Sequence, residues 1–244
     1  MIPLIKIDDK ELPILIHGTS PFIGAGQFGT RAREYYRRFY QNPTLMSQFF
    51  VYFSSKCYPC IHIIPYPPII EAMEIASELR SINVIATVED KMDLELIARF
   101  DPAIVFLHAS ITDRMDRKEI EGFSEACNEL GYTLGVATHN PGETIPVLEK
   151  IEGIRAYMVP INPLGLYMSP SFDSTLIAIE YARKNDKFIF GMKTLAGGRI
   201  NPYKGFPFAL NYAHAIVVGF TELKQIDEAC SLVKKIVEEN IHQV

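Results

Sequence analysis

The chain has 244 residues, of which 48% are hydrophobic and 22% are charged, and its formal net charge is −5. This composition supports one large core and excludes an intrinsically disordered chain. The mildly acidic balance argues against a general nucleic-acid or anionic-membrane binder, and no apolar run reaches the roughly 18 residues of a membrane helix. We therefore expect a cytoplasmic protein with a small-molecule substrate and neither a nucleic-acid nor a membrane partner. Self-association into a homo-oligomer is left open.

Short apolar runs rich in β-branched residues alternate with helical patterns along the whole chain. Most of these runs lack a strict apolar–polar alternation, which is typical of strands buried on both faces of a parallel sheet. After a lead-in at Ile2–Ile7, we predict strands over Leu12–His17, Cys60–Ile64, Asn83–Val88, Ala103–His108, Thr133–Thr138, Ala156–Pro160, Phe188–Lys193 and Ala215–Gly219.

The segments between these strands predict helices, several of them with end signals. Gly131 is a natural C-cap, and Asp173 and Thr221 are candidate N-caps. The predicted helices are Ala32–Tyr40, Thr44–Ser54, Ile69–Arg80, Asp93–Phe100, Lys118–Leu130, Glu143–Ile151, Ser174–Arg183, a brief turn at Pro207–Ala213, and Leu223–Asn240.

Strand–helix alternation over a length close to the roughly 250 residues of one barrel predicts the α/β class and a single (β/α)8 TIM barrel over residues 1–244. A doubly wound open sheet is the main competitor.

A long helical insertion, at about 19–59, separates the first two predicted strands. It follows the C-terminal end of a strand, so it lies on the face that carries barrel active sites. A lid and a packed decoration are equal alternatives. Gly24, Gly26 and Gly29 fit the G-x-G-x-x-G spacing of a dinucleotide-binding fingerprint, but no acidic residue follows about 20 positions on, so they read as hinge residues of this loop. Arg31 with its basic neighbours reads as a solvated helix face, and a clamp on an anionic ligand is the alternative.

Histidines gather where the predicted strands end. His17, His108 and His139 end three strands, and Glu89 follows a fourth. Neutral imidazoles with one carboxylate are a common ligand set for zinc or iron. His17, Glu89, His108 and His139 are therefore a candidate site for a divalent metal such as zinc. Other polar residues on this rim are His62, Thr87 and Asp113.

Lys193 ends the seventh strand, where it reads as a phosphate anchor, a general base or a Schiff-base amine. A salt bridge to Glu89 or another rim acid is the structural alternative.

Glycines follow the last two strands, at the place where barrels commonly bind phosphate. Gly197 and Gly198 follow the seventh strand, and Gly219 follows the eighth. Glycine lets backbone N–H groups approach an anion, and Arg199 and Lys224 add positive charge. We expect a phosphorylated ligand or a nucleotide here.

The four cysteines are too few for a disulfide scaffold, and the expected compartment keeps thiols reduced. Cys57 and Cys60 form a lone C-x-x-C pair. A structural zinc site needs a second pair of ligands, so we interpret the two as buried thiols leading into a strand.

The second half of the chain, from about Pro102 onward, resembles the aldo-keto reductase superfamily. The resemblance is carried by the fourth strand with its terminal histidine, the fifth strand, the seventh strand with its glycine turn, and the eighth strand with its helix: Asp101–His108, Gly131–Asn140, Gly191–Arg199 and Ala215–Cys230. In the first half, His62 stands where the family has an aspartate. Tyr66 matches the family tyrosine only approximately in position, and Thr87 and Val88 stand where the family lysine is expected.

The resemblance implies an aldo-keto reductase-like oxidoreductase that acts on a small carbonyl metabolite with NADP. His108 would polarise the carbonyl with Tyr66, and Lys193 is a further catalytic candidate. The expected cofactor-binding residues are Thr138, His139 and Asn162 at the nicotinamide, and Gly197, Gly198, Arg199, Gly219, Thr221 and Lys224 at the phosphates. A metal-dependent lyase, isomerase or hydrolase and a non-enzymatic phosphate or nucleotide binder remain alternatives.

Overall fold

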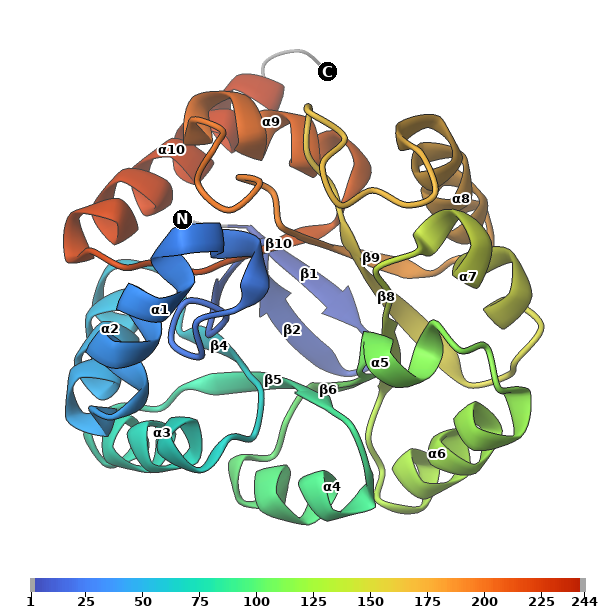
Figure 1. Ribbon diagram of the computed structural model, residues 1–244, viewed down its shortest axis with the longest axis horizontal. Helices are drawn as coiled ribbons and strands as arrows, with labels where there is room; N and C mark the ends of the chain where they lie inside the picture. The colour runs from blue at the N-terminus through green and yellow to red at the C-terminus, as the bar shows by residue number, and fades with distance from the viewer. Residues whose placement is uncertain (1–2, 242–244) are drawn as a thin grey trace.

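The computed structural model describes residues 3–241, so both ends of the predicted domain, including Ile2, lie outside the described residues. Eight parallel strands close into a barrel in the order β10-β3-β4-β5-β6-β7-β8-β9, with helices around it (Figure 1). The predicted (β/α)8 barrel is confirmed, and the open sheet is excluded. The strands are β3 (Leu15–Gly18), β4 (Cys60–Ile63), β5 (Asn83–Val88), β6 (Ile104–Leu107), β7 (Leu134–Ala137), β8 (Ile154–Pro160), β9 (Phe188–Met192) and β10 (Ala215–Val218).

A two-stranded hairpin precedes the barrel. It pairs β1 (Leu4–Ile7) with β2 (Lys10–Pro13), so the predicted first strand is really two elements divided after Pro13. Proline has no N–H to continue a ladder, which explains the break. Ile7 and Leu12 of the hairpin pack into the barrel interior and fill one end of it, and Figure 1 shows the hairpin crossing the middle of the ring.

The helices follow the strands in turn. They are α2 (Pro43–Lys56), α3 (Pro67–Leu79), α4 (Lys91–Ile97), α6 (Arg117–Glu129), α7 (Pro141–Leu148), α8 (Phe172–Lys184), α9 (Pro202–Tyr212) and α10 (Leu223–Ile241), with short α5 (Ala109–Thr112) and η3 (Ala98–Phe100). Gly131 ends α6 with φ +73°, as predicted. The predicted cap Asp173 is wrong: Ser171 caps α8 by accepting from Ser174. Within residues 3–241, no helix is both long and apolar enough to cross a membrane.

The insertion after β3 consists of η1 (Gly26–Arg31), α1 (Ala32–Tyr35) and the π-helical turn η2 (Tyr36–Tyr40). Gly24 and Gly29 have φ values of +60° and +57°, which favour glycine over any residue with a Cβ. No regular helix follows these glycines directly, so the segment lacks the geometry of a dinucleotide-binding fingerprint.

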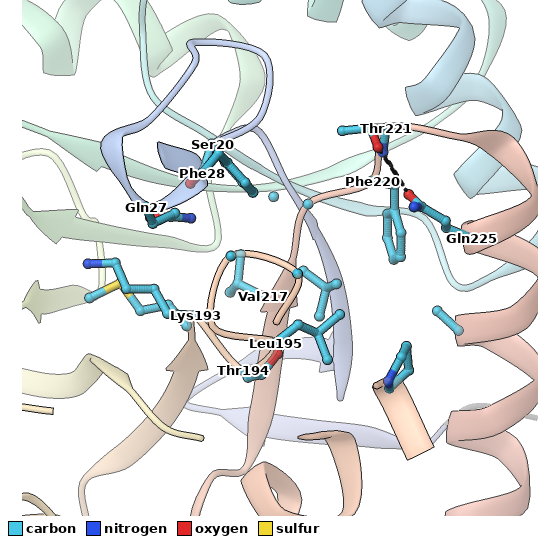
Figure 2. A pocket seen from close by; sticks show the side chains of 18 of the residues that line it. Ser20, Gln27, Phe28, Lys193, Thr194, Leu195, Val217, Phe220, Thr221 and Gln225 are labelled. Carbon is cyan, nitrogen blue, oxygen red and sulfur yellow. Dashed lines mark hydrogen bonds between the residues drawn. The ribbon is translucent and has the colours of Figure 1, made fainter. Parts of the chain in front are cut away.

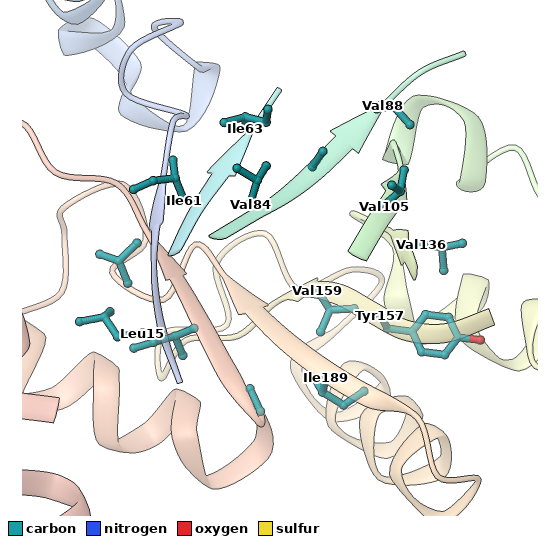
Figure 3. Close-up of a cluster of buried hydrophobic side chains, with 14 of the residues drawn as sticks. Leu15, Ile61, Ile63, Val84, Val88, Val105, Val136, Tyr157, Val159 and Ile189 are labelled. Atoms are coloured by element: carbon teal, nitrogen blue, oxygen red, sulfur yellow. The ribbon is translucent and has the colours of Figure 1, made fainter. Parts of the chain in front are cut away.

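The barrel wall separates two hydrophobic layers. Alternate strand side chains point outward against the helices, including Leu15, Ile61 and Val84 (Figure 3). Their neighbours Ile16 and Cys60 fill the interior. This period of two decides which polar residues at the strand ends can reach the barrel mouth.

A disulfide joins the end of α2 to α10 through Cys57 and Cys230, with the Cα atoms 5.8 Å apart. The expectation that these cysteines are reduced is therefore wrong for this pair. Cys60 and Cys127 are buried free thiols. Because 173 residues separate Cys57 from Cys230, no local sequence pattern predicts this disulfide.

Candidate active site

A cavity of about 320 Å³ opens at the C-terminal ends of the barrel strands. This volume lies at the lower end of the range of about 300–1,000 Å³ for small-molecule sites. The loops after β9 and β10, the insertion after β3 and the first turns of α10 form its walls (Figure 2). Of the predicted site residues, the cavity wall contains Lys193, Gly197, Gly198, Gly219 and Thr221.

Two arginines connect the insertion to the loop after β9. Arg31 Nη2 donates to the carbonyl oxygen of Gly197 at 2.7 Å, and Arg199 Nη1 donates to that of Gln27 at 3.3 Å. Gly197 has φ +68°, and a Cβ there would lie 2.2 Å from the Gln27 oxygen, so only glycine permits this approach. Arg31 is exposed, as predicted, and its side chain also lines the cavity.

A side chain of α10 itself caps the N-terminus of this helix. Gln225 Oε1 accepts hydrogen bonds from the backbone N–H groups of Thr221 at 2.9 Å and Glu222 at 3.2 Å, as Figure 2 shows for Thr221. An anion bound at these groups would have to replace the Gln225 side chain. Lys224, predicted to bind phosphate, is exposed and outside the cavity lining.

His108 lies just past β6 beside an acid. Its Nδ1 is 3.2 Å from Glu89 Oε1 and accepts from the backbone N–H of Ser110 at 3.2 Å. Partial burial lowers the pKa of His108, while the charges of Glu89 and Asp113 act in the opposite direction. The protonated ring donates from Nδ1 to Glu89 and presents Nε2–H as a second donor. In the neutral ring, Nδ1 either accepts from the Ser110 N–H or donates to Glu89, and Nε2 carries the proton only in the first case.

Asp113 organises the loop after β7. Its carboxylate accepts hydrogen bonds from the Thr138 hydroxyl, from the Thr144 hydroxyl at 3.2 Å and from the backbone N–H of His139 at 2.9 Å. These bonds hold His139 beside His108, with the ring centroids 6.4 Å apart. The Thr138 hydroxyl, predicted to bind nicotinamide, is thus occupied by Asp113.

Lys193 closes the set of titratable side chains at the mouth. Burial lowers its pKa from 10.5 to about 8, although the negative charge of Asp113 raises it. The pKa of His139 is lowered to about 4, mainly by burial and also by the positive charge of Lys193. Among the described residues, Lys193 forms no salt bridge with Glu89, which was the structural alternative. Glu89 instead pairs with His108.

His62 and Thr87 lie inside the mouth on neighbouring strands. His62 Nε2 is 2.7 Å from the Thr87 hydroxyl, and both side chains are buried. His62 also lines the cavity, and its Nδ1 has no hydrogen-bond partner within residues 3–241. Burial lowers the pKa of His62 to about 3, so the ring is neutral at physiological pH.

The structure does not assemble the predicted metal set. Because Ile16 faces the interior, the next residue, His17, points to the helix layer, where Phe50 and Phe53 of α2 pack against its ring. It is fully buried behind the barrel wall, away from Glu89 and His108. No group of three His, Cys, Asp or Glu side chains suited to a metal ion occurs among the described residues.

Two other predicted site residues lie apart from the cavity. Tyr66 is 40% exposed and packs its ring edge against Tyr40. Asn162 is buried, and its amide is used by the following loop, donating to Leu166 O at 2.7 Å and accepting from Leu164 N at 3.2 Å. That Tyr66 and Asn162 each follow a strand did not reveal that their side chains lie outside the cavity.

Asp113, His62 and Thr87 were expected on the rim, but their residue types and spacing indicated no role for them there. The structure places Cys60 and Ile85 inside the barrel, so the residues two positions later, His62 and Thr87, also face inward, but no alternation in the sequence identified the inner face beforehand. Nor did any pattern point to Asp113, which acts through bonds to a different strand end.

Solved structures share this architecture over nearly the whole chain. A Pseudomonas aeruginosa protein provisionally assigned to the aldo-keto reductases has a TM-score of 0.71 and 15% identity, covering 96% of each chain. An aldo-keto reductase from a Medee basin deep-sea metagenome library has a TM-score of 0.61 and 10% identity, covering 96% of this chain and 94% of that one.

A third match comes from a different enzyme class. A truncated 3-deoxy-D-arabino-heptulosonate 7-phosphate synthase from Thermotoga maritima has a TM-score of 0.60 and 12% identity, covering 98% of this chain and 93% of that one. No protein-family model and no curated protein sequence matches the chain. The chain therefore shares the (β/α)8 barrel fold of these structures.

Proposed function

We propose that the protein is an oxidoreductase that transfers hydride between a nicotinamide nucleotide and a small carbonyl metabolite. The observation that supports this most is a single cavity running from Lys193 and His62 at the mouth to Gly197, Gly219 and the start of α10. An elongated ligand with a reactive end and an anionic end suits this arrangement. The fold shared with aldo-keto reductase structures supports the same class of reaction.

The phosphate end of the cavity suits a nucleotide, because Gly197, Gly198 and Gly219 expose bare backbone there and Arg31 supplies a cation. The N–H groups at the start of α10 would join them once the phosphate displaces the Gln225 side chain. NADP is the cofactor that we propose. When bound, the reduced nucleotide supplies the hydride.

The chain's own residues would then handle the carbonyl group. His108 Nε2–H would donate a hydrogen bond to the carbonyl oxygen, and the protonated Nζ of Lys193 would deliver the proton that the oxygen gains. Proton transfer from a positioned acid is typically worth about 10²–10⁴ in rate. Lys193 takes this role because it lines the cavity, whereas Tyr66 does not. His108 is not among the lining residues either, and it would act from the adjoining strand end.

Binding and turnover test this proposal separately. The chain has no tryptophan, so the fluorescence of NADPH or NADH can be followed without protein emission near it. We expect either nucleotide to raise the melting temperature. Replacing Arg31 with Gln should weaken binding about tenfold, whereas R33Q, a matched change at an exposed residue of α1, should not.

Turnover is measured with a panel of small aldehydes and ketones. H108Q should lower kcat about a hundredfold or more while leaving nucleotide affinity unchanged. The proposal fails if millimolar NADPH and NADH neither stabilise the protein nor change their fluorescence in its presence.

A further inference from the structure

Lys193 has the position and freedom of a nucleophile. It lines the cavity directly after β9, and Figure 2 shows its side chain extending beyond the end of that strand. Within residues 3–241, its Nζ has no partner among the hydrogen bonds and ion pairs. Its Nζ lies 5.5 Å from the centroid of the Tyr167 ring. The amine is therefore not occupied by a structural salt bridge.

The backbone at Lys193 is strained. Its φ is +55°, a left-handed value that residues with a Cβ rarely adopt. The neighbouring loops hold it there, because the Lys193 carbonyl accepts from the Ala196 N–H at 2.8 Å and from Asn162 Nδ2 at 3.4 Å. Such strain persists where surrounding structure enforces it, often at functional sites.

Three titratable groups from other elements lie at the same end of the barrel and interact electrostatically with the amine. Asp113 follows α5, His108 follows β6 and His139 follows β7, and the charge of Lys193 acts on the pKa of both histidines. Burial of Lys193 leaves a substantial fraction of its amine uncharged near pH 8. His108, whose Nδ1 is 3.2 Å from Glu89 Oε1, is a proton donor and acceptor at the same end of the barrel.

We propose that Lys193 captures small neutral aldehydes and ketones as a reversible imine, without any nucleotide. This activity goes beyond the oxidoreductase function and does not depend on it. The carboxylates of Glu89 and Asp113 beside the mouth disfavour an anionic substrate.

Imine formation needs only Lys193, the carbonyl compound and His108. The lone pair of neutral Nζ forms a C–N bond to the carbonyl carbon, and the carbonyl π electrons move to oxygen. One proton passes from nitrogen to that oxygen and gives a carbinolamine. His108 then protonates the hydroxyl, which leaves as water, and the nitrogen lone pair forms the protonated imine. Addition of water reverses the sequence.

Reductive trapping tests the proposal. The wild-type protein is incubated with glycolaldehyde or hydroxyacetone and sodium cyanoborohydride, without nucleotide, and its lysines are mapped by peptide mass spectrometry. We expect Lys193 to be modified at least about tenfold faster than the exposed Lys204 of α9, with a rate that rises with pH up to about 8.

Two variants sharpen the result. K193R keeps the cation and should lose the fast modification, whereas K204R should keep it. Equal rates at Lys193 and Lys204 in the folded wild-type protein would overturn the proposal, and this comparison requires no variant to fold. Because nucleotide is absent, a failure here leaves the oxidoreductase proposal standing, and a failure of nucleotide binding leaves imine capture standing.

Discussion

Replacing Lys193 with Met should stabilise the protein while removing its reactive amine. Burial lowers the pKa of Lys193 from 10.5 to about 8. Each unit of pKa shift corresponds to about 1.36 kcal/mol, so the charged amine costs the folded state about 3 kcal/mol at pH 7. This value is an upper bound because the side chain is only partly buried. Met has a similar length and carries no charge, so K193M should recover most of this free energy.

The sign of the pH dependence follows from linkage. Between pH 8 and 10.5, the unfolded state binds more protons at Lys193 than the folded state does. The free energy of unfolding of the wild-type protein should therefore rise with pH across this window, and below pH 8 the deficit is constant. The difference between K193M and wild type should be largest at pH 7 and should shrink toward pH 10.

Urea unfolding at pH 7 and pH 10 measures the effect. K204M is the matched control, because Lys204 is exposed on α9 and its replacement should change stability by less than about 0.5 kcal/mol. If K193M is less stable than wild type at pH 7, the lysine makes favourable contacts in the folded state and this reasoning is wrong. A stabilised variant without activity is the expected mark of a residue retained for chemistry.

Three further changes test other parts of the molecule. C230S removes the disulfide to Cys57, which closes a loop of 173 residues. By the chain-entropy relation, it should lower the free energy of unfolding by up to about 5 kcal/mol. Equal urea midpoints of the wild-type protein with and without reductant would contradict the disulfide. H17F replaces a fully buried ring whose two nitrogens have no partner within the described residues, so it should stabilise by about 1–3 kcal/mol at pH 7. Because burial lowers the pKa of His17 from 6.5 to about 3, the unfolded state binds more protons in that window. The stability of H17F should therefore fall less than that of the wild-type protein between pH 6.5 and pH 3. If H17F is instead less stable than the wild-type protein at pH 7, the His17 ring has a hydrogen-bond partner. D113N removes the charge that raises the pKa of Lys193, so the pH dependence of reductive trapping at Lys193 should move to lower pH. An unchanged pH profile would show that the charge of Asp113 does not act on Lys193.

The barrel could be predicted from the sequence because its signals are local. Runs such as Asn83–Val88 are apolar and β-branched, and the structure places β5 at the predicted residues. Burial on both faces of a parallel sheet requires apolar side chains at successive positions, so the pattern is visible without any knowledge of partners. The glycine turn at Gly197 and Gly198 was recognised for the same reason, since left-handed backbone favours one residue type.

The candidate site was only partly predictable. His108 and Lys193 are at the mouth because their strands end there, whichever face they point to. Arg31 was assigned to a solvated surface, because its position over the cavity depends on how the insertion folds back across β9.

What the sequence determined by itself is the order of strands and helices and the places where strands end. Only the tertiary structure decided which side of the barrel wall each polar residue occupies, as the contrast between buried His17 and cavity-lining His62 shows. A shift of one residue along a strand moves a side chain to the opposite face, so the face is settled by strand boundaries and register, which depend on contacts between distant segments. The bond between Cys57 and Cys230 and the carboxylate bonds of Asp113 depend on the same long-range contacts.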